Sequence, residues 1–150
     1  MLTPADFPGL VVDRIDSPPH RPATVHATPV YQPARECPKC GCARFVTAAP
    51  VTLRDIVRGL PVRLVVAARR YWCWPCHSGE ADPIPWRSER HPTLTVGAVL
   101  IIADHLRQGE TPAQIIKRYG RVNFPGPSTI NEIRIAHGIP PSKRGRKAKA

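Results

Sequence analysis

Four of the five cysteines in this chain form two Cys-x-x-Cys pairs, Cys37 with Cys40 and Cys73 with Cys76, which residues 41–72 separate. Two such pairs supply four thiolates, the complete tetrahedral ligand set of a structural zinc ion. Gly41 directly follows the first pair, and glycine suits a tight knuckle because it accepts a positive φ and lets backbone N–H groups face the sulfurs. The spacing therefore predicts a zinc site held by Cys37, Cys40, Cys73 and Cys76.

Two other uses of paired cysteines compete with zinc binding. Disulfides form in oxidising compartments, but residues 1–4 lack the basic and apolar regions that begin a signal peptide, so we expect a reducing, cytoplasmic setting. A thioredoxin-type redox pair would belong to a βαβ pattern and would need no second pair. Cys42 and His77 lie beside the two pairs, and either could replace one ligand, although four cysteines already close the shell.

Strands must bring these two distant pairs together. A β-prone run at 45–47 continues into 51–53, a turn signal follows, and a second run at 62–72 leads into the second pair. We therefore expect a zinc ribbon over residues 37–77, in which one β-hairpin carries two cysteine knuckles. So small a unit has little core of its own, and zinc contributes about 10–16 kcal/mol of folding free energy in comparable peptides.

The rest of the chain divides by composition around this ribbon. Residues 1–36 contain two predicted strands that would pack on the zinc module as a small β layer. Residues 78–93 are rich in proline and polar residues and are predicted to be a linker. Residues 94–141 adopt the helical period, and 142–150 form a basic tail. The predicted fold class is a small α+β protein: a zinc ribbon, then a three-helix helix-turn-helix module and a disordered tail.

The chain is strongly basic. Its 150 residues include 22 Lys and Arg against 11 Asp and Glu, which gives a net charge of +11 and a pI near 10.2. This balance indicates a polyanionic partner, and no apolar run is long enough for a transmembrane helix, so no membrane partner is expected. Arginines of the predicted hairpin could contact phosphates or form a solvated strand face. The candidates are Arg63, Arg69 and Arg70.

Helical signals mark the second half of the chain. The first predicted helix covers 95–107, where apolar residues recur at helical spacing after a possible cap at Thr93 or Thr95. The second begins at Thr111 with a capping box and with proline at its first position, and it ends at Gly120. Caps and turns at these places predict a helix-turn-helix arrangement.

The third helix is the predicted recognition helix. It begins at Ser128 or Thr129 after a connection, 121–127, that is longer than the usual three or four residues. On its polar side an asparagine could read adenine, an arginine could read guanine or hold phosphate, and an exposed isoleucine could touch a thymine methyl group. A plain three-helix bundle without DNA binding is the alternative. The residues assigned to DNA contact are Ser128, Thr129, Asn131, Glu132, Arg134 and Ile135.

The tail is basic and carries no acidic residue. Its Arg144-Gly145-Arg146 core resembles an AT-hook, which inserts such a core into the minor groove of A·T-rich DNA. Lys147 stands where the hook has proline, so a disordered tail that adds nonspecific affinity is the competing interpretation. The tail residues assigned to DNA contact are Lys143, Arg144, Arg146 and Lys147.

The order of these parts resembles a known arrangement. Strands precede Cys-Pro-x-Cys-Gly, an arginine-rich hairpin, Arg-Tyr-Trp-Cys-x-x-Cys and a helix-turn-helix that ends in Gly-Ile-Pro. Over about residues 10–140 this resembles the N-terminal DNA-binding region of zinc-finger insertion-sequence transposases, whose catalytic domain uses Asp-Asp-Glu carboxylates. The resemblance implies a four-cysteine zinc ribbon and a base-reading helix at 128–137 that bind terminal inverted repeats. The chain ends where the catalytic domain would begin, so a small phage or mobile-element regulator fits equally well.

Together these features predict a zinc-dependent, sequence-specific double-stranded DNA-binding protein of a mobile element or phage, associated with the nucleoid. No acid–base pair lies in a predicted pocket, so an enzyme is not expected. A homodimer is an open alternative, because helix-turn-helix proteins usually dimerise. An RNA- or ribosome-associated zinc ribbon and a protein-interaction adaptor also stay open, as do the target sequence and the regulatory role.

Overall fold

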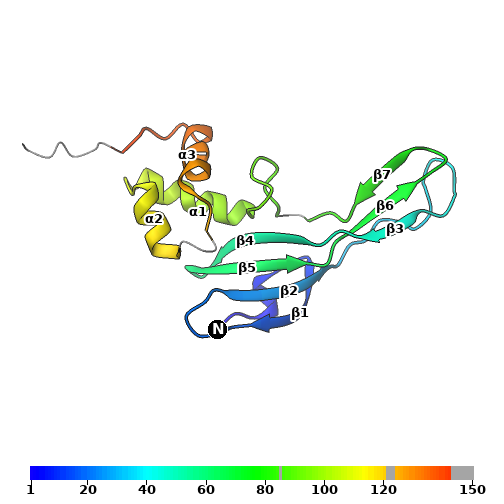
Figure 1. The fold of residues 1–150 in the computed structure, drawn as a ribbon, viewed down its shortest axis with the longest axis horizontal. Coiled ribbons are helices and arrows are strands. Elements are labelled where there is room, and N and C mark those ends of the chain that lie inside the picture. The colour runs from blue at the N-terminus through cyan, green and yellow to red at the C-terminus, as the bar shows by residue number, and fades with distance from the viewer. Residues whose placement is uncertain (85, 121–123, 143–150) are drawn as a thin grey trace, which may run out of the picture.

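The strand-rich first half and the helical second half of the chain build a small α+β protein (Figure 1). The computed structural model describes residues 1–84, 86–120 and 124–142. Within them the chain forms a four-stranded sheet, a three-stranded sheet and three α-helices. The four-stranded sheet occupies the middle of the molecule, with the helices at one end and the three-stranded sheet at the other (Figure 1).

The four-stranded sheet has the strand order β1-β2-β5-β4. Its strands are β1 (Leu10–Asp16), β2 (Ala23–Pro29), β4 (Val51–Val57) and β5 (Leu60–Val66). β1 with β2 and β4 with β5 are antiparallel, whereas β2 and β5 run parallel. Side chains alternate along each strand, so Val62 and Leu64 are buried while Arg63 between them is exposed. One face of this sheet therefore carries a core.

This core is closed by segments from both ends of the strand region. A short 3-10 helix (Pro4–Asp6) places Phe7 against the buried face, and the Phe7 ring centroid lies 6.4 Å from that of Trp86. The N-terminal residues are thus part of the fold. The buried members of the cluster are Phe7, Leu10, Val25, Ala27, Leu53, Val62, Leu64, Val66 and Ala68.

The three-stranded sheet contains the strands next to the cysteine pairs. Its members β3 (Phe45–Ala48), β6 (Arg69–Cys73) and β7 (Ser78–Ala81) lie in the order β3-β6-β7, and both pairings are antiparallel. All four residues of β3 are exposed, and of the three strands only Tyr71 and Cys73 are buried. This sheet therefore has almost no hydrophobic core.

The predicted single hairpin is wrong. The run 62–72 was expected to form one strand, but it forms β5 in one sheet and β6 in the other. The chain crosses between the sheets at Ala67 and Ala68, where Ala67 N donates to Ala27 O at 2.8 Å. The cause is a change of partner, because β5 pairs with β2 and β4 while β6 pairs with β3 and β7. The predicted linker 78–93 also contains a strand, β7.

The first helix begins at Thr95, one of its two predicted caps, and the second begins at its predicted cap, Thr111. α1 (Val96–Arg107) starts after Thr95, whose side chain accepts a hydrogen bond from Ala98 N. α2 (Pro112–Tyr119) starts after Thr111, which forms the predicted capping box with Gln114. These contacts satisfy N–H groups that have no partner within a helix. Short-range sequence signals therefore set both helix starts correctly.

α3 (Pro127–Ala136) begins one residue before the predicted start. Gly126 is its N-cap and makes no side-chain cap hydrogen bond, and Pro127 occupies the first turn. Proline is favoured there because its fixed φ already suits the helix and because its missing N–H is not needed. Ser128 and Thr129 therefore lie inside the first turn instead of capping it.

The helices pack into a second core that rests on the edge of the four-stranded sheet. Arg54 N donates to Thr93 O at 2.9 Å and Thr95 N donates to Arg54 O at 3.1 Å, so the segment before α1 pairs with β4. Ile56 of β4 belongs to the helical core cluster. The helical module is therefore fixed to the sheet. Among the described residues, no helix combines the length and apolar composition that crossing a bilayer requires.

Candidate metal centre and DNA-contact residues

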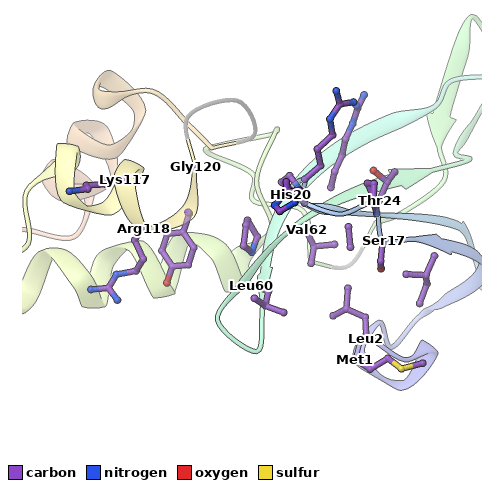
Figure 2. Close-up of a pocket in the computed structure, with 18 residues that line it drawn as sticks. Met1, Leu2, Ser17, His20, Thr24, Leu60, Val62, Lys117, Arg118 and Gly120 are labelled. Carbon is purple, nitrogen blue, oxygen red and sulfur yellow. The ribbon is translucent and has the colours of Figure 1, made fainter.

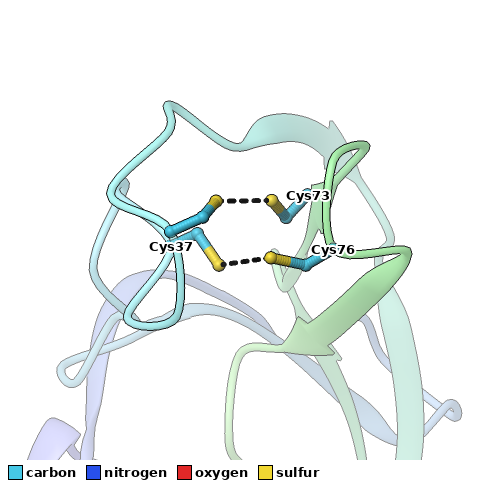
Figure 3. Close-up of side chains that lie close together, drawn as sticks. Cys37, Cys73 and Cys76 are labelled. Carbon is cyan, nitrogen blue, oxygen red and sulfur yellow. Dashed lines mark hydrogen bonds between the residues drawn. The ribbon is translucent and has the colours of Figure 1, made fainter.

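The four predicted ligands converge in space. Their Sγ atoms all lie within 4.8 Å of one another, with 3.9 Å between Cys37 and Cys76 and 3.5 Å between Cys40 and Cys73 (Figure 3). A tetrahedron with metal–sulfur bonds of about 2.3 Å has edges of about 3.8 Å. Both of these separations lie close to that edge length. These cysteines are close enough to hold a metal ion, and the all-sulfur set is consistent with zinc.

Each knuckle is a turn that short-range hydrogen bonds close. In the first, Gly41 N donates to Cys37 O at 2.8 Å and Cys37 N donates to Cys42 O at 2.9 Å. Gly41 has a φ of +74° with open space where a Cβ would lie, so backbone conformation, not crowding, favours glycine here. In the second, which joins β6 to β7, His77 N donates to Trp74 O at 3.2 Å.

The surroundings of the sulfurs differ between the knuckles. Hydrogen bonds from the backbone N–H groups of Lys39 and Cys40 lower the pKa of the Cys37 thiol to about 6. In the second knuckle, interaction with Cys40 and burial raise the pKa of the Cys76 thiol to about 12. Four thiolates at these distances would repel one another, and a divalent metal ion bound between them would offset that repulsion.

Neither alternative ligand joins the cluster. Within the described part of the chain, the group of metal-ligating side chains consists of the two Cys-x-x-Cys pairs and includes neither Cys42 nor His77. Cys42 is exposed, and interaction with Cys40 together with the charge of Cys40 raises the pKa of the Cys42 thiol. The four-cysteine set is thus closed without a fifth donor.

The exposed side of α3 carries most of the side chains predicted to contact DNA. Ile130 and Ile133 are fully buried and anchor the helix on the core. The opposite side is solvated, and even the apolar Ile135 is 65% exposed. Thr129 is half-buried. The exposed predicted residues are Ser128, Asn131, Glu132 and Ile135.

Arg134 is already engaged within the protein. Its Nη1 donates to Ile139 O at 3.1 Å and its Nε lies 3.4 Å from Asn131 Oδ1. The guanidinium therefore ties the end of α3 to the chain that follows it. The carboxylate of Glu132 lies 3.9 Å from Nδ1 of the buried His91, which places the segment before α1 next to α3.

The predicted phosphate-contact arginines lie on different surfaces. Arg63 is exposed on β5, opposite Arg54 in the pairing with β4. Arg69 and Arg70 belong to β6 in the other sheet, and as consecutive residues they point to opposite faces. The three arginines therefore do not share one ribbon face. The predicted tail contacts Lys143, Arg144, Arg146 and Lys147 lie outside the described residues.

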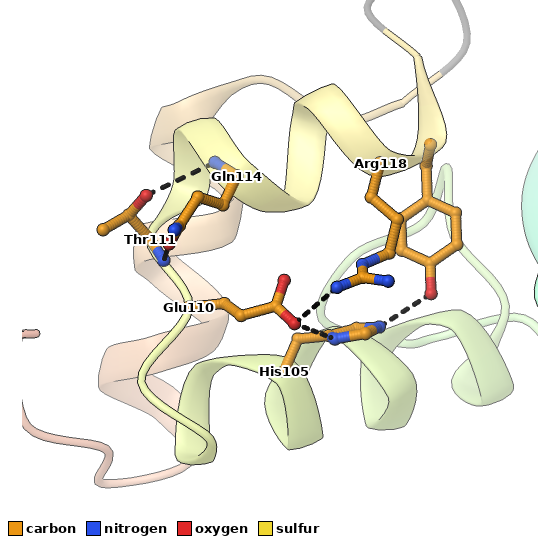
Figure 4. A network of polar contacts seen from close by, with 6 residues as sticks. His105, Glu110, Thr111, Gln114 and Arg118 are labelled. Atoms are coloured by element: carbon orange, nitrogen blue, oxygen red, sulfur yellow. Dashed lines mark hydrogen bonds and ion pairs between the residues drawn. The ribbon is translucent and has the colours of Figure 1, made fainter.

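A polar network that the sequence did not reveal holds α2 against α1 (Figure 4). His105 Nε2 lies 2.7 Å from Tyr119 Oη, and His105 Nδ1 lies 3.0 Å from Glu110 Oε1. Arg118 donates to the same Glu110 oxygen at 2.8 Å. Burial acts to raise the pKa of Glu110, but hydrogen bonds from His105 and Arg118 outweigh it and lower that pKa.

An open hollow of about 1400 Å³ separates α2 from the end of the four-stranded sheet (Figure 2). Arginine and lysine side chains line it without any carboxylate among the described lining residues. Lys117 points away from the sheet in Figure 2, and Arg118 is bound to Glu110. The two cations of α2 at this hollow therefore do not converge on a common point.

Comparison of the whole chain with protein-family models, with curated proteins and with solved structures finds no match.

Proposed function

We propose that this chain is a zinc-dependent, sequence-specific double-stranded DNA-binding protein. The proposal depends above all on the exposed side of α3, where Asn131 and Ile135 project from a helix anchored by buried isoleucines. The side-chain amide of asparagine can bond adenine twice, its NH2 donating to N7 and its oxygen accepting from N6, and an aliphatic side chain can contact the thymine methyl group. An α-helix of 10 residues is about 15 Å long, and the major groove of B-DNA admits such a helix.

The charge of the protein supports a nucleic-acid partner. A net charge of +11 favours association with a polyanion at any sequence. Contacts to bases must then supply the preference for a site, and α3 exposes side chains that can make such contacts. The resemblance to the end-binding region of zinc-finger insertion-sequence transposases supports a role in a mobile element or phage, as an end-binding module or a transcriptional regulator.

Zinc is the proposed metal because the donor set is four cysteine sulfurs within 4.8 Å of one another. Such a set selects zinc or an iron–sulfur cluster over the hard cations that prefer oxygen. We expect elemental analysis of the purified protein to give one zinc per chain. Iron, with the visible absorption of a cluster, would assign the site to a redox centre instead.

The experiment that tests DNA recognition begins with selection of bound duplexes from a random pool. The affinities of the selected duplex and a scrambled duplex are then compared for the parent and for the variants Asn131→Ala and Ile135→Ala. We expect Asn131→Ala to lose about 1–3 kcal/mol on the selected duplex only. Arg134→Ala is a poorer probe, because it also removes the bond to Ile139 O.

The matched control is Arg14→Ala on β1, which removes one exposed positive charge far from α3 along the chain. It should leave the ratio of selected to scrambled affinity unchanged. If both α3 variants show the same ratio of selected to scrambled duplex affinity as the parent, the assignment of α3 as the recognition helix is wrong. A pool that yields no enriched duplex, with tighter binding to structured RNA, would favour the RNA-associated alternative.

A further inference from the structure

A row of aromatic side chains crosses one face of the three-stranded sheet. Phe45 of β3 lies directly opposite Trp72 of β6 in the strand pairing, and cross-strand neighbours of this kind have Cβ atoms about 5 Å apart. The ring centroid of Trp74 lies 6.0 Å from that of Trp72, with the planes at 78°. Phe45 is 58% exposed and Trp74 is 64% exposed. We refer to these three side chains as the aromatic face.

The backbone beneath the row holds the central indole in place. Gly79 of β7 lies opposite Trp72. A Cβ on Gly79 would come within 2.7 Å of Trp72 Cε3 and 2.8 Å of Tyr71 O, closer than side chains approach. Glycine therefore lets the Trp72 ring lie against the strand. The ring next to Trp74 is thus positioned before any ligand arrives.

The charges on the sheet are sorted between its two faces. Arg70 lies two residues before Trp72 on β6, so it shares the aromatic face, and it is exposed. Glu80 pairs with Tyr71 in register and so lies on the opposite face, where it bonds Arg44 at 2.6 Å. In the described part of the chain Arg70 takes part in no ion pair. The aromatic face thus combines open rings with an uncompensated cation.

We propose that the aromatic face binds an unpaired DNA strand, with bases stacked on Trp74 and Phe45 and a phosphate contacting Arg70. Stacking platforms beside a positive charge are the common means of holding single strands, because every base has a π-face. A duplex hides those faces, so this contact differs from that of α3. The choice of DNA over RNA rests on the proposed function, whereas the stacking chemistry rests on the sheet alone.

Aliphatic and aromatic replacements separate base stacking from simple hydrophobic docking. The probe is a labelled oligothymidine of about 15 nucleotides, near the upper site size of single-strand binding modules. We expect parent binding to quench tryptophan fluorescence. Trp74→Leu and Phe45→Leu should each weaken binding by about 5- to 150-fold, the loss of one stacked base. Trp74→Phe and Phe45→Tyr keep a ring and should restore most of the affinity.

Two controls keep the result interpretable. Zinc content measured for every variant shows that the knuckle beside Trp74 is intact. Leu60→Ala removes an exposed apolar side chain, 56% accessible, at the β4–β5 turn outside the aromatic face, and it should bind as the parent does. If the leucine variants bind oligothymidine as tightly as the variants that keep a ring, base stacking is not the mode of binding. Tighter binding to oligouridine than to oligothymidine would overturn the assignment to DNA.

The outcomes also separate this inference from the proposed function. If the selected duplex is still recognised through α3 but oligothymidine causes no quenching, the inference fails alone. If oligothymidine binds through Trp74 while no duplex is enriched, the duplex proposal fails alone. Sedimentation measures whether the protein is a monomer or a dimer. If the parent is a dimer and Trp74→Leu is a monomer with unchanged oligothymidine affinity, the aromatic face is the contact with a second copy of this chain.

Discussion

Loss of the metal should unfold the three-stranded sheet and leave the rest of the protein folded. Neither hydrophobic core cluster includes a residue of β3, β6 or β7. Tyr71 is the largest buried side chain of this sheet, and its burial contributes about 3 kcal/mol at most. A four-cysteine zinc site contributes about 10–16 kcal/mol, which is comparable to the whole stability of a typical domain, about 5–15 kcal/mol. A zinc ion held by the four cysteines would therefore be the dominant stabilising contribution to this sheet.

The perturbation is Cys73→Ser, which removes one ligand from the buried side of the site. Amide hydrogen exchange measured by mass spectrometry gives the stability of each strand separately. We expect protection to disappear in peptides that cover β3, β6 and β7. Peptides that cover β5 and α1 should keep theirs, because those elements belong to the two core clusters. Treatment of the parent with a strong chelator should give the same pattern.

Cys42→Ser is the matched control, because it makes the same chemical change at an exposed cysteine outside the ligand set. It should retain metal and protection throughout. The reasoning is refuted if the chelated parent keeps protected amides in β6, since the sheet would then be stable without a metal. It is also refuted if Cys42→Ser releases the metal as Cys73→Ser does.

Three further outcomes are expected. Gly79→Ala should destabilise the β6–β7 pairing by about 1–3 kcal/mol, because the new methyl group collides with Trp72; local hydrogen exchange measures this, with unchanged protection in α1. Thr95→Ala should lower the free energy of unfolding in urea by about 1–2 kcal/mol, since Thr95 caps α1 and also donates to Asp55 at 2.5 Å. Because the pKa of Glu110 is lower in the folded than in the unfolded protein, its ionised form stabilises the fold above the unfolded pKa, and this stabilisation is lost as pH falls through the folded pKa. Glu110→Gln should therefore flatten the acid side of the profile of unfolding free energy against pH. An unchanged profile would contradict the stabilising role of the Glu110 carboxylate.

The two proposed contacts lie at opposite ends of the molecule. α3 belongs to the helical end and the aromatic face to the three-stranded sheet, with the four-stranded sheet between them (Figure 1). The pairing of residues 93–95 with β4 fixes the helical end to that sheet. A ligand that engaged both contacts would therefore have to span the protein.

The prediction of the metal ligands and of the first two helix starts depended on short-range features. Both Cys-x-x-Cys knuckles, the Thr95 cap and the Thr111 capping box involve residues within a few positions of one another. Their geometry follows from turn and cap chemistry that needs no knowledge of the rest of the chain. The convergence of the two pairs was expected because a single ion needs four sulfurs.

The pairing partners of the strands could not be predicted from short-range features of the sequence. A period-2 run predicts a strand and its two faces but does not say which strand lies beside it. The run 62–72 has the sequence pattern of one continuous strand. In the structure its first half, β5, pairs in parallel with β2, whereas its second half, β6, pairs with β3. The hairpin arginines were consequently distributed over two sheets instead of one ribbon face.

The sequence by itself identified the four cysteines that converge, the cap of the second helix and the excess of positive charge, and it narrowed the cap of the first helix to Thr93 or Thr95. Only the tertiary structure decided that Phe45, Trp72 and Gly79 share one sheet face and that Arg134 is bonded at the end of α3. The physical reason is the separation along the sequence of the residues that interact. Turns and caps are stabilised by neighbours in the chain, whereas sheet order and the exposure of a side chain depend on which distant segments bury apolar surface together.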